Sequence, residues 1–134
     1  MNIAYLIDTD WVIDYFNDAE PVASKIEELV EIGSGISIIS LAELYEGIYN
    51  SRDVKLAEDK LIEFLSDVVI LEINEEICKI FGKERGKLRK RGAMIGDFDL
   101  IIASTALYYN IPLCSNNRKH YKNVDGLEIV TIHK

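Results

Sequence analysis

The chain has 134 residues, 49% of them hydrophobic, and a formal net charge of −8. This length suits one domain with a real core, and we expect a single domain over residues 1–134. No apolar run is long enough to cross a bilayer, the N-terminus lacks the basic region and cleavage site of a signal peptide, and the net charge argues against a general nucleic-acid binder, so we expect a cytoplasmic protein.

Strands and helices alternate along the sequence. In chain order, we expect strand 3–7, helix 11–16, helix 21–32, strand 36–39, helix 40–49, helix 54–66, strand 67–71, helix 74–91, helix 97–109, strand 111–115, a turn or short helix 116–121 and strand 127–132. This alternation predicts a three-layer α/β/α fold with a parallel sheet of about five strands. Cys78 and Cys114 stand in apolar surroundings, and we expect both to be reduced core residues.

Carboxylates follow the ends of the predicted strands. Asp8 ends the first strand, Glu43 lies in the first turn after the second, and Asp97 and Asp99 flank the start of the helix before the fourth. That fourth strand ends in Ser115, Asn116 and Asn117. Because ligands bind at the carboxyl ends of parallel strands, we expect these groups at one rim of the sheet.

Clustered carboxylates repel one another and raise each other's pKa unless a cation lies among them. A few hard oxygen ligands with water suit Mg²⁺ or Mn²⁺ better than zinc, and the sequence offers no His or Cys spacing for a soft metal. Such an ion activates water and stabilises the charge of a phosphate under attack. The acids therefore indicate phosphoryl chemistry.

Several of these residues also have a structural interpretation. Glu43 completes a Ser40-x-x-Glu43 capping box, and for Asp97 we favour an N-cap over a site role. Thr9 or Asp10 fits the N-cap of the first helix, and Asp10 fits a supporting site role equally well.

Function is favoured at two positions. A charged residue that ends a buried strand, as Asp8 does, needs a partner, and a free acid such as Asp99 is costly on a buried helix. Ser115, Asn116 and Asn117 also fit a simple turn, and His120 fits a surface loop.

The same segments resemble the PIN-domain family of metal-dependent ribonucleases, and within it the VapC-type toxins of toxin–antitoxin pairs. The four segments that carry the resemblance, in order, are LIDTD, SLAELYEG, IGDFDLIIASTA and LCSNNRKHY. The resemblance covers essentially the whole chain and implies a PIN-like fold. Two departures stand out: Asp10 replaces the usual Asn, and Asn117 stands where a fourth acid is common.

The resemblance implies that Asp8, Glu43 and Asp99 are the catalytic acids that bind Mg²⁺ or Mn²⁺. It implies supporting roles for four further residues, namely Asp10, Asp97, Ser115 and Asn117. The implied reaction is hydrolysis of an RNA phosphodiester by metal-activated water. Seven of the fifteen Lys and Arg lie between residues 79 and 91. Arg89, Lys90, Arg91 and Arg118 are the candidate RNA contacts, against the alternative of a solvated helix face.

The resemblance also implies protein partners, namely a cognate antitoxin that lies along an apolar groove, and a second copy of the chain in a homodimer. Trp11 with Tyr15, and Tyr45 with Tyr49, are each one helical turn apart and offer such a surface unless some are core residues.

Two other functions fit parts of the sequence. A phosphatase of the haloacid-dehalogenase type also opens with an apolar strand and Asp-x-Asp, here Asp8 and Asp10, although no lysine stands suitably before Asp97. A non-catalytic α/β interaction domain would use the acids only as caps and for solvation.

Overall fold

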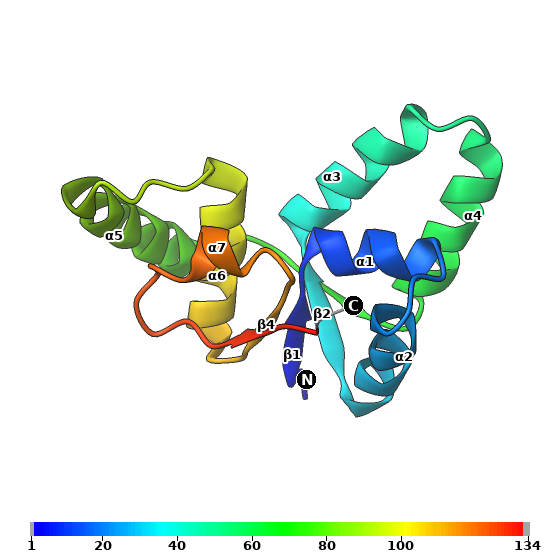
Figure 1. Cartoon of the computed structure of the whole chain (residues 1–134), viewed down its shortest axis with the longest axis horizontal. Coiled ribbons are helices and arrows are strands. Elements are labelled where there is room, and N and C mark those ends of the chain that lie inside the picture. The colour runs from blue at the N-terminus through cyan, green and yellow to red at the C-terminus, as the bar shows by residue number, and fades with distance from the viewer. Residues whose placement is uncertain (1, 133–134) are drawn as a thin grey trace.

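A five-stranded sheet forms the centre of this computed structural model, which describes residues 2–132 (Figure 1). The strand order is β3–β2–β1–β4–β5, and every pairing is parallel, which confirms the predicted sheet. The strands are β1 Tyr5–Ile7, β2 Ser34–Ser37, β3 Val69–Leu71, β4 Leu113–Cys114 and β5 Ile129–Val130. The central strand, β1, pairs Leu6 with Gly35 on one side and with Leu113 on the other.

Helices cover both faces of the sheet, as the three-layer prediction requires (Figure 1). One face carries α1 Thr9–Phe16, α2 Val22–Ile32, α3 Ile38–Tyr49 and α4 Val54–Leu65. The other carries α5 Glu75–Arg91, α6 Asp97–Tyr109 and α7 Arg118–Tyr121. Within the described residues, no helix has the length and apolar character that crossing a bilayer requires.

Each face of the sheet has its own hydrophobic cluster, because successive side chains of a strand point to opposite faces. Ile7 and Cys114 join the cluster under α1–α4, with Trp11 fully buried in it. Leu6 and Leu113 join the cluster under α5–α7. The rigid strand ends between these two clusters position the polar residues that follow.

Some expected boundaries are wrong. The first, third, fourth and fifth strands are shorter than predicted, while the second lies two residues earlier, so that the run 36–39 divides between β2 and the start of α3. The reason is the cap: Ser37 Oγ accepts a hydrogen bond from Ile39 N at 3.0 Å, which turns the chain into a helix directly. Cys78 is exposed, contrary to expectation, whereas Cys114 is buried, and both thiols are free.

Candidate active site

Asp8 directly follows β1 and is only 2% exposed. Its Oδ1 accepts a hydrogen bond from Thr9 N at 2.8 Å, and its Oδ2 accepts one from the Tyr121 hydroxyl at 2.9 Å. Burial, and then the charge of Asp10, raise the pKa of Asp8 from 3.8 to about 6, although hydrogen bonds from Ser115, Thr9 and Tyr121 oppose the rise. Asp8 is also the N-cap of α1, so the expected caps Thr9 and Asp10 were wrong.

Asp99 reaches the same edge of the sheet from the first turn of α6. Its Oδ1 lies 3.3 Å from the Tyr121 hydroxyl, and its Oδ2 lies 3.2 Å from His120 Nδ1. The Asp99 side chain is 28% exposed, so it is the open neighbour of buried Asp8. The structure thus brings Asp8 and Asp99 together at one hydroxyl. His120 is an exposed residue, as expected, but it also contacts a candidate catalytic acid.

Glu43 is connected to this pair through Thr9. The Thr9 hydroxyl donates to Glu43 Oε1 at 2.7 Å and is hydrogen-bonded to Ser40 Oγ at 2.9 Å, while the Thr9 amide bonds to Asp8. The expected Ser40–Glu43 capping box is wrong, because Ser37 caps α3 and Ser40 lies buried inside the helix. Glu43 therefore has no role as a cap and is available to the site.

Asp10 supports the loop that follows β4. It accepts hydrogen bonds from Asn116 N at 2.9 Å and from Ser115 Oγ at 3.4 Å, and burial raises its pKa. Ser115 Oγ in turn accepts from Asn117 N at 3.1 Å. Asn117 itself is exposed and contributes this backbone amide to the network.

Asn116 joins three segments, a role that sequence reasoning missed because the residue fits an ordinary turn. Its side-chain Oδ1 accepts hydrogen bonds from Trp11 Nε1 at 3.0 Å and from Ile132 N at 3.0 Å, while its backbone amide donates to Asp10 Oδ2. Tyr121 was missed for the same reason: a lone tyrosine in a predicted turn carries no pattern.

Asp97 faces away from these contacts. The N-cap of α6 is Gly96, so the expected cap role of Asp97 is wrong. Its exposed carboxylate instead forms an ion pair with Arg85 of α5. Asp97 and Asp99 are two residues apart on α6, yet Asp97 forms a surface ion pair and Asp99 contacts the site.

Basic residues border the open side of Asp99. A hollow of about 430 Å³ is lined by Asp99, Lys119 and His120, and a neighbouring one of about 490 Å³ by Arg118, Lys119 and His120. Arg89 and Lys90 are exposed in the last turn of α5.

Arg91 is held by the loop after α7. Its Nη2 donates to Asp125 at 2.6 Å and its Nη1 donates to the Asn123 carbonyl at 2.9 Å. Among the four basic residues expected to contact RNA, Arg91 would have to exchange this ion pair for a phosphate.

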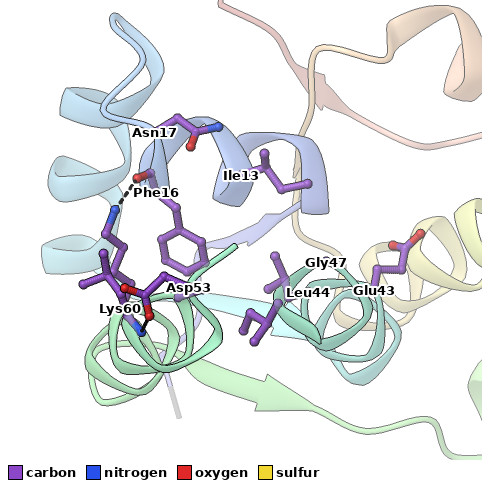
Figure 2. A pocket seen from close by; sticks show the side chains of 11 residues that line it. Ile13, Phe16, Asn17, Glu43, Leu44, Gly47, Asp53 and Lys60 are labelled. Carbon is purple, nitrogen blue, oxygen red and sulfur yellow. Dashed lines mark hydrogen bonds between the residues drawn. The ribbon is translucent and has the colours of Figure 1, made fainter. Parts of the chain in front are cut away.

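A second feature is an apolar groove between α1, α3 and α4, with a volume of about 300 Å³ (Figure 2). Ile13 and Leu56, 47% and 54% exposed, line it together with Leu44. Glu43 lies at one end of this groove and Lys60 at the other (Figure 2). Trp11, expected as part of such a surface, is buried instead.

The site residues fit a hard divalent cation in their chemistry. Asp8 and Asp99 supply carboxylate oxygens within reach of one hydroxyl, and Mg²⁺ commonly takes one or two carboxylates and completes its shell with water. Within residues 2–132, no three Asp, Glu, His or Cys side chains converge as a metal site. Glu43 is therefore not placed as a third direct ligand beside Asp8 and Asp99.

The fold and site define a class: a parallel α/β/α protein in which a carboxylate at the end of the central strand β1 meets one from the first turn of α6. The PIN domain family model matches residues 5–127. The chain belongs to the PIN-domain family, and its curated relatives place it among the VapC proteins.

Two relatives and one solved structure illustrate the similarity. Ribonuclease VapC1 of Methanocaldococcus jannaschii is 39% identical over 92% of this chain and 85% of that protein. Ribonuclease VapC2 of Rickettsia felis is 32% identical over 92% of this chain and 93% of that protein. The structure of VapBC2 from Rickettsia felis bound to a promoter DNA fragment matches with a TM-score of 0.89 at 28% identity, over 98% of this chain and 100% of that one. These matches favour neither the phosphatase nor the non-catalytic alternative.

Proposed function

We propose that this chain is a Mg²⁺- or Mn²⁺-dependent endoribonuclease, and that it is the toxin of a toxin–antitoxin pair acting in the cytoplasm. The observation that supports it most is the meeting of Asp8 and Asp99 at the Tyr121 hydroxyl, on the edge of the sheet where α/β proteins bind ligands. The relatives named as ribonucleases point to the same chemistry.

In this proposal Asp8 and Asp99 hold the cation, directly or through water. When bound, the ion lowers the pKa of water and stabilises the charge that develops on the scissile phosphate. Glu43 orients the attacking water: Thr9 fixes its Oε1, which leaves Oε2 as an acceptor. Because water is the nucleophile, the reaction needs no ribose 2′-hydroxyl, and the products carry a 3′-hydroxyl and a 5′-phosphate.

The RNA backbone approaches from the side of the hollows that Lys119 and His120 share. Lys119 lines the same hollow as Asp99, and Arg118 lines the neighbouring hollow. Arg89, Lys90 and Arg91 add basic residues in the last turn of α5. Phosphate contacts of this kind make binding weaker as salt rises. Arg118→Gln should therefore weaken RNA binding and reduce its salt dependence, as measured by fluorescence anisotropy.

The antitoxin occupies the apolar groove in this proposal. Ile13 and Leu56 offer exposed apolar surface, and a segment that fills the groove would contact Glu43, so occupation would cover a catalytic acid. Leu56→Glu should release a co-expressed antitoxin in pull-down experiments and leave RNA cleavage intact. We also propose a homodimer, which light scattering on the purified chain tests.

The central test compares two neighbouring acids of α6. RNA cleavage with Mn²⁺ should fall to background in Asp99→Asn and stay near wild type in Asp97→Asn, the matched control that removes an equal charge two residues away. EDTA should abolish the wild-type activity. Robust turnover of p-nitrophenyl phosphate that is lost in Asp8→Asn, with RNA untouched, would instead favour the phosphatase alternative.

A further inference from the structure

Tyr121 is fully buried, and its ring and its hydroxyl have different surroundings. The ring belongs to the hydrophobic cluster under α5–α7, with Leu100 and Leu113. The hydroxyl lies 2.9 Å from Asp8 Oδ2 and 3.3 Å from Asp99 Oδ1. A phenylalanine would supply the same ring to the cluster, so packing alone does not require the hydroxyl.

The hydroxyl is a permanent donor. A phenol is protonated at neutral pH, so the Tyr121 hydroxyl can donate to the carboxylates beside it. Its single proton is shared by two carboxylates that would otherwise repel each other. A shared donor therefore joins two carboxylates that lie far apart in the sequence, one directly after β1 and one in α6.

Each carboxylate has a second anchor of its own. Thr9 N holds Asp8 Oδ1, and His120 Nδ1 lies against Asp99 Oδ2. Neither anchor reaches the other acid. Among the side chains of the described residues, Tyr121 is the one whose hydrogen bonds join both acids.

We propose that Tyr121 is a positioning residue of the cation site, whose hydroxyl holds Asp8 and Asp99 in place so that a divalent ion binds to a preformed pair of carboxylates. The inference rests on the proposed function for the identity of these two ligands. Partners that orient metal ligands typically change metal affinity by roughly 10- to 100-fold when removed.

The test is Mn²⁺ binding by isothermal titration calorimetry, which does not depend on activity. Tyr121→Phe should weaken Mn²⁺ binding about 10-fold or more. Tyr108→Phe is the matched control, because it removes a hydroxyl from a half-exposed tyrosine at the other end of α6. The Mn²⁺ affinity of this variant should equal that of the wild type. Asp99→Asn should remove binding.

Urea unfolding with and without 5 mM Mn²⁺ keeps the test valid if Tyr121→Phe is less stable. The stabilisation that Mn²⁺ adds reports affinity separately from the metal-free stability. It should be smaller in Tyr121→Phe than in Tyr108→Phe.

Three outcomes would overturn the proposal. Equal Mn²⁺ affinity in Tyr121→Phe and the wild type would leave the hydroxyl a purely structural role, and tighter binding would make it a competitor of the ion. Either result leaves the proposed nuclease intact, because wild-type binding and RNA cleavage are measured separately. Absence of Mn²⁺ binding by the wild type would contradict the inference and the metal-dependent function together.

Discussion

The two ends of the acidic cluster differ in how they are held. At the inner end, Asp8 is 2% exposed, is hydrogen-bonded to the first residue of α1 and has a raised pKa. At the outer end, Asp99 is 28% exposed and lines a hollow together with His120 and Lys119. At the inner end, burial and then the charge of Asp10 disfavour the ionised form of Asp8, whereas the outer end gives access to ligands from solvent.

This difference assigns separate tasks to two acids that carry the same functional group. A buried carboxylate costs stability in the absence of a cation, so its presence is better explained by binding than by folding. A half-exposed carboxylate costs little and is reachable by substrate. Substitutions at the two ends should therefore affect stability and activity in different proportions.

The largest effect is expected from Asp8→Asn. Nuclease activity should fall to background, yet the metal-free protein should become more stable at neutral pH, by about 3 kcal/mol, because the shift of the Asp8 pKa to about 6 is lost. An asparagine can still accept from Thr9 N and face the Tyr121 hydroxyl. Urea unfolding in EDTA measures the change in stability. If Asp8→Asn were less stable than the wild type, the charge of Asp8 would not destabilise the metal-free fold.

The pH dependence of metal-free stability should follow Asp8. Its folded pKa is about 6 and its ordinary value 3.8, so the folded state binds more protons than the unfolded state between these values. The contribution of Asp8 to the free energy of unfolding should therefore be most favourable below about pH 4 and should be lost as the pH rises through 6. Asp10, whose pKa burial also raises, adds to this fall.

The difference in unfolding free energy between the wild type and Asp8→Asn isolates the contribution of Asp8. Unfolding free energies of the wild type and Asp8→Asn, measured from pH 4 to pH 8 in EDTA, should converge at the acidic end and separate by up to about 3 kcal/mol above pH 6. Mn²⁺ should flatten the wild-type curve because it favours the ionised acid. Parallel curves in EDTA would contradict the assignment of the raised pKa to Asp8.

The position of Asp8 at the inner end was easier to predict from the sequence than the hydrogen bonds around it. A charged residue directly after a five-residue apolar run, as Asp8 is, has few structural alternatives, and the parallel alternation of elements placed Glu43 and Asp99 near the same edge. The helix caps were harder to predict. Ser37 rather than Ser40 caps α3, since the largely apolar run 36–39 fits a strand or a buried helix equally well.

Long-range polar contacts were beyond sequence reasoning. Tyr121 meets Asp8 across 113 residues, and Trp11 Nε1 meets Asn116 across 105. Such bonds depend on how α7 and the loop after β4 dock on the sheet, and no local pattern encodes that docking. The groove was likewise assigned to the wrong residues, because helical spacing predicts a face but not what covers it. Trp11 is buried, and Ile13 and Phe16 line the groove. The other three expected residues, Tyr15, Tyr45 and Tyr49, do not line it either.

A smaller effect is expected from Asp10→Asn, which sharpens the comparison within the inner end. The amide can still accept from Asn116 N and donate to Ser115 Oγ, so the loop after β4 should keep its place. The charge that raises the Asp8 pKa is removed, and the metal-free protein should gain about 1 kcal/mol or less. Activity should persist, as RNA cleavage assays would show, and a loss comparable to Asp8→Asn would make Asp10 a ligand rather than a support.

The smallest effect is expected at the Asp97–Arg85 ion pair, on the solvent-exposed side of the outer end. The Asp97 carboxylate is 62% exposed, and exposed pairs contribute about 0–1 kcal/mol because water and salt screen them. A double-mutant cycle of Asp97→Asn and Arg85→Gln, followed by urea unfolding at low and high salt, should give a coupling within that range that shrinks with salt. A coupling of several kcal/mol would mean that this pair, and not the contacts of Asp99 with Tyr121 and His120, fixes the start of α6. The division between a buried inner end and an accessible outer end would then fail.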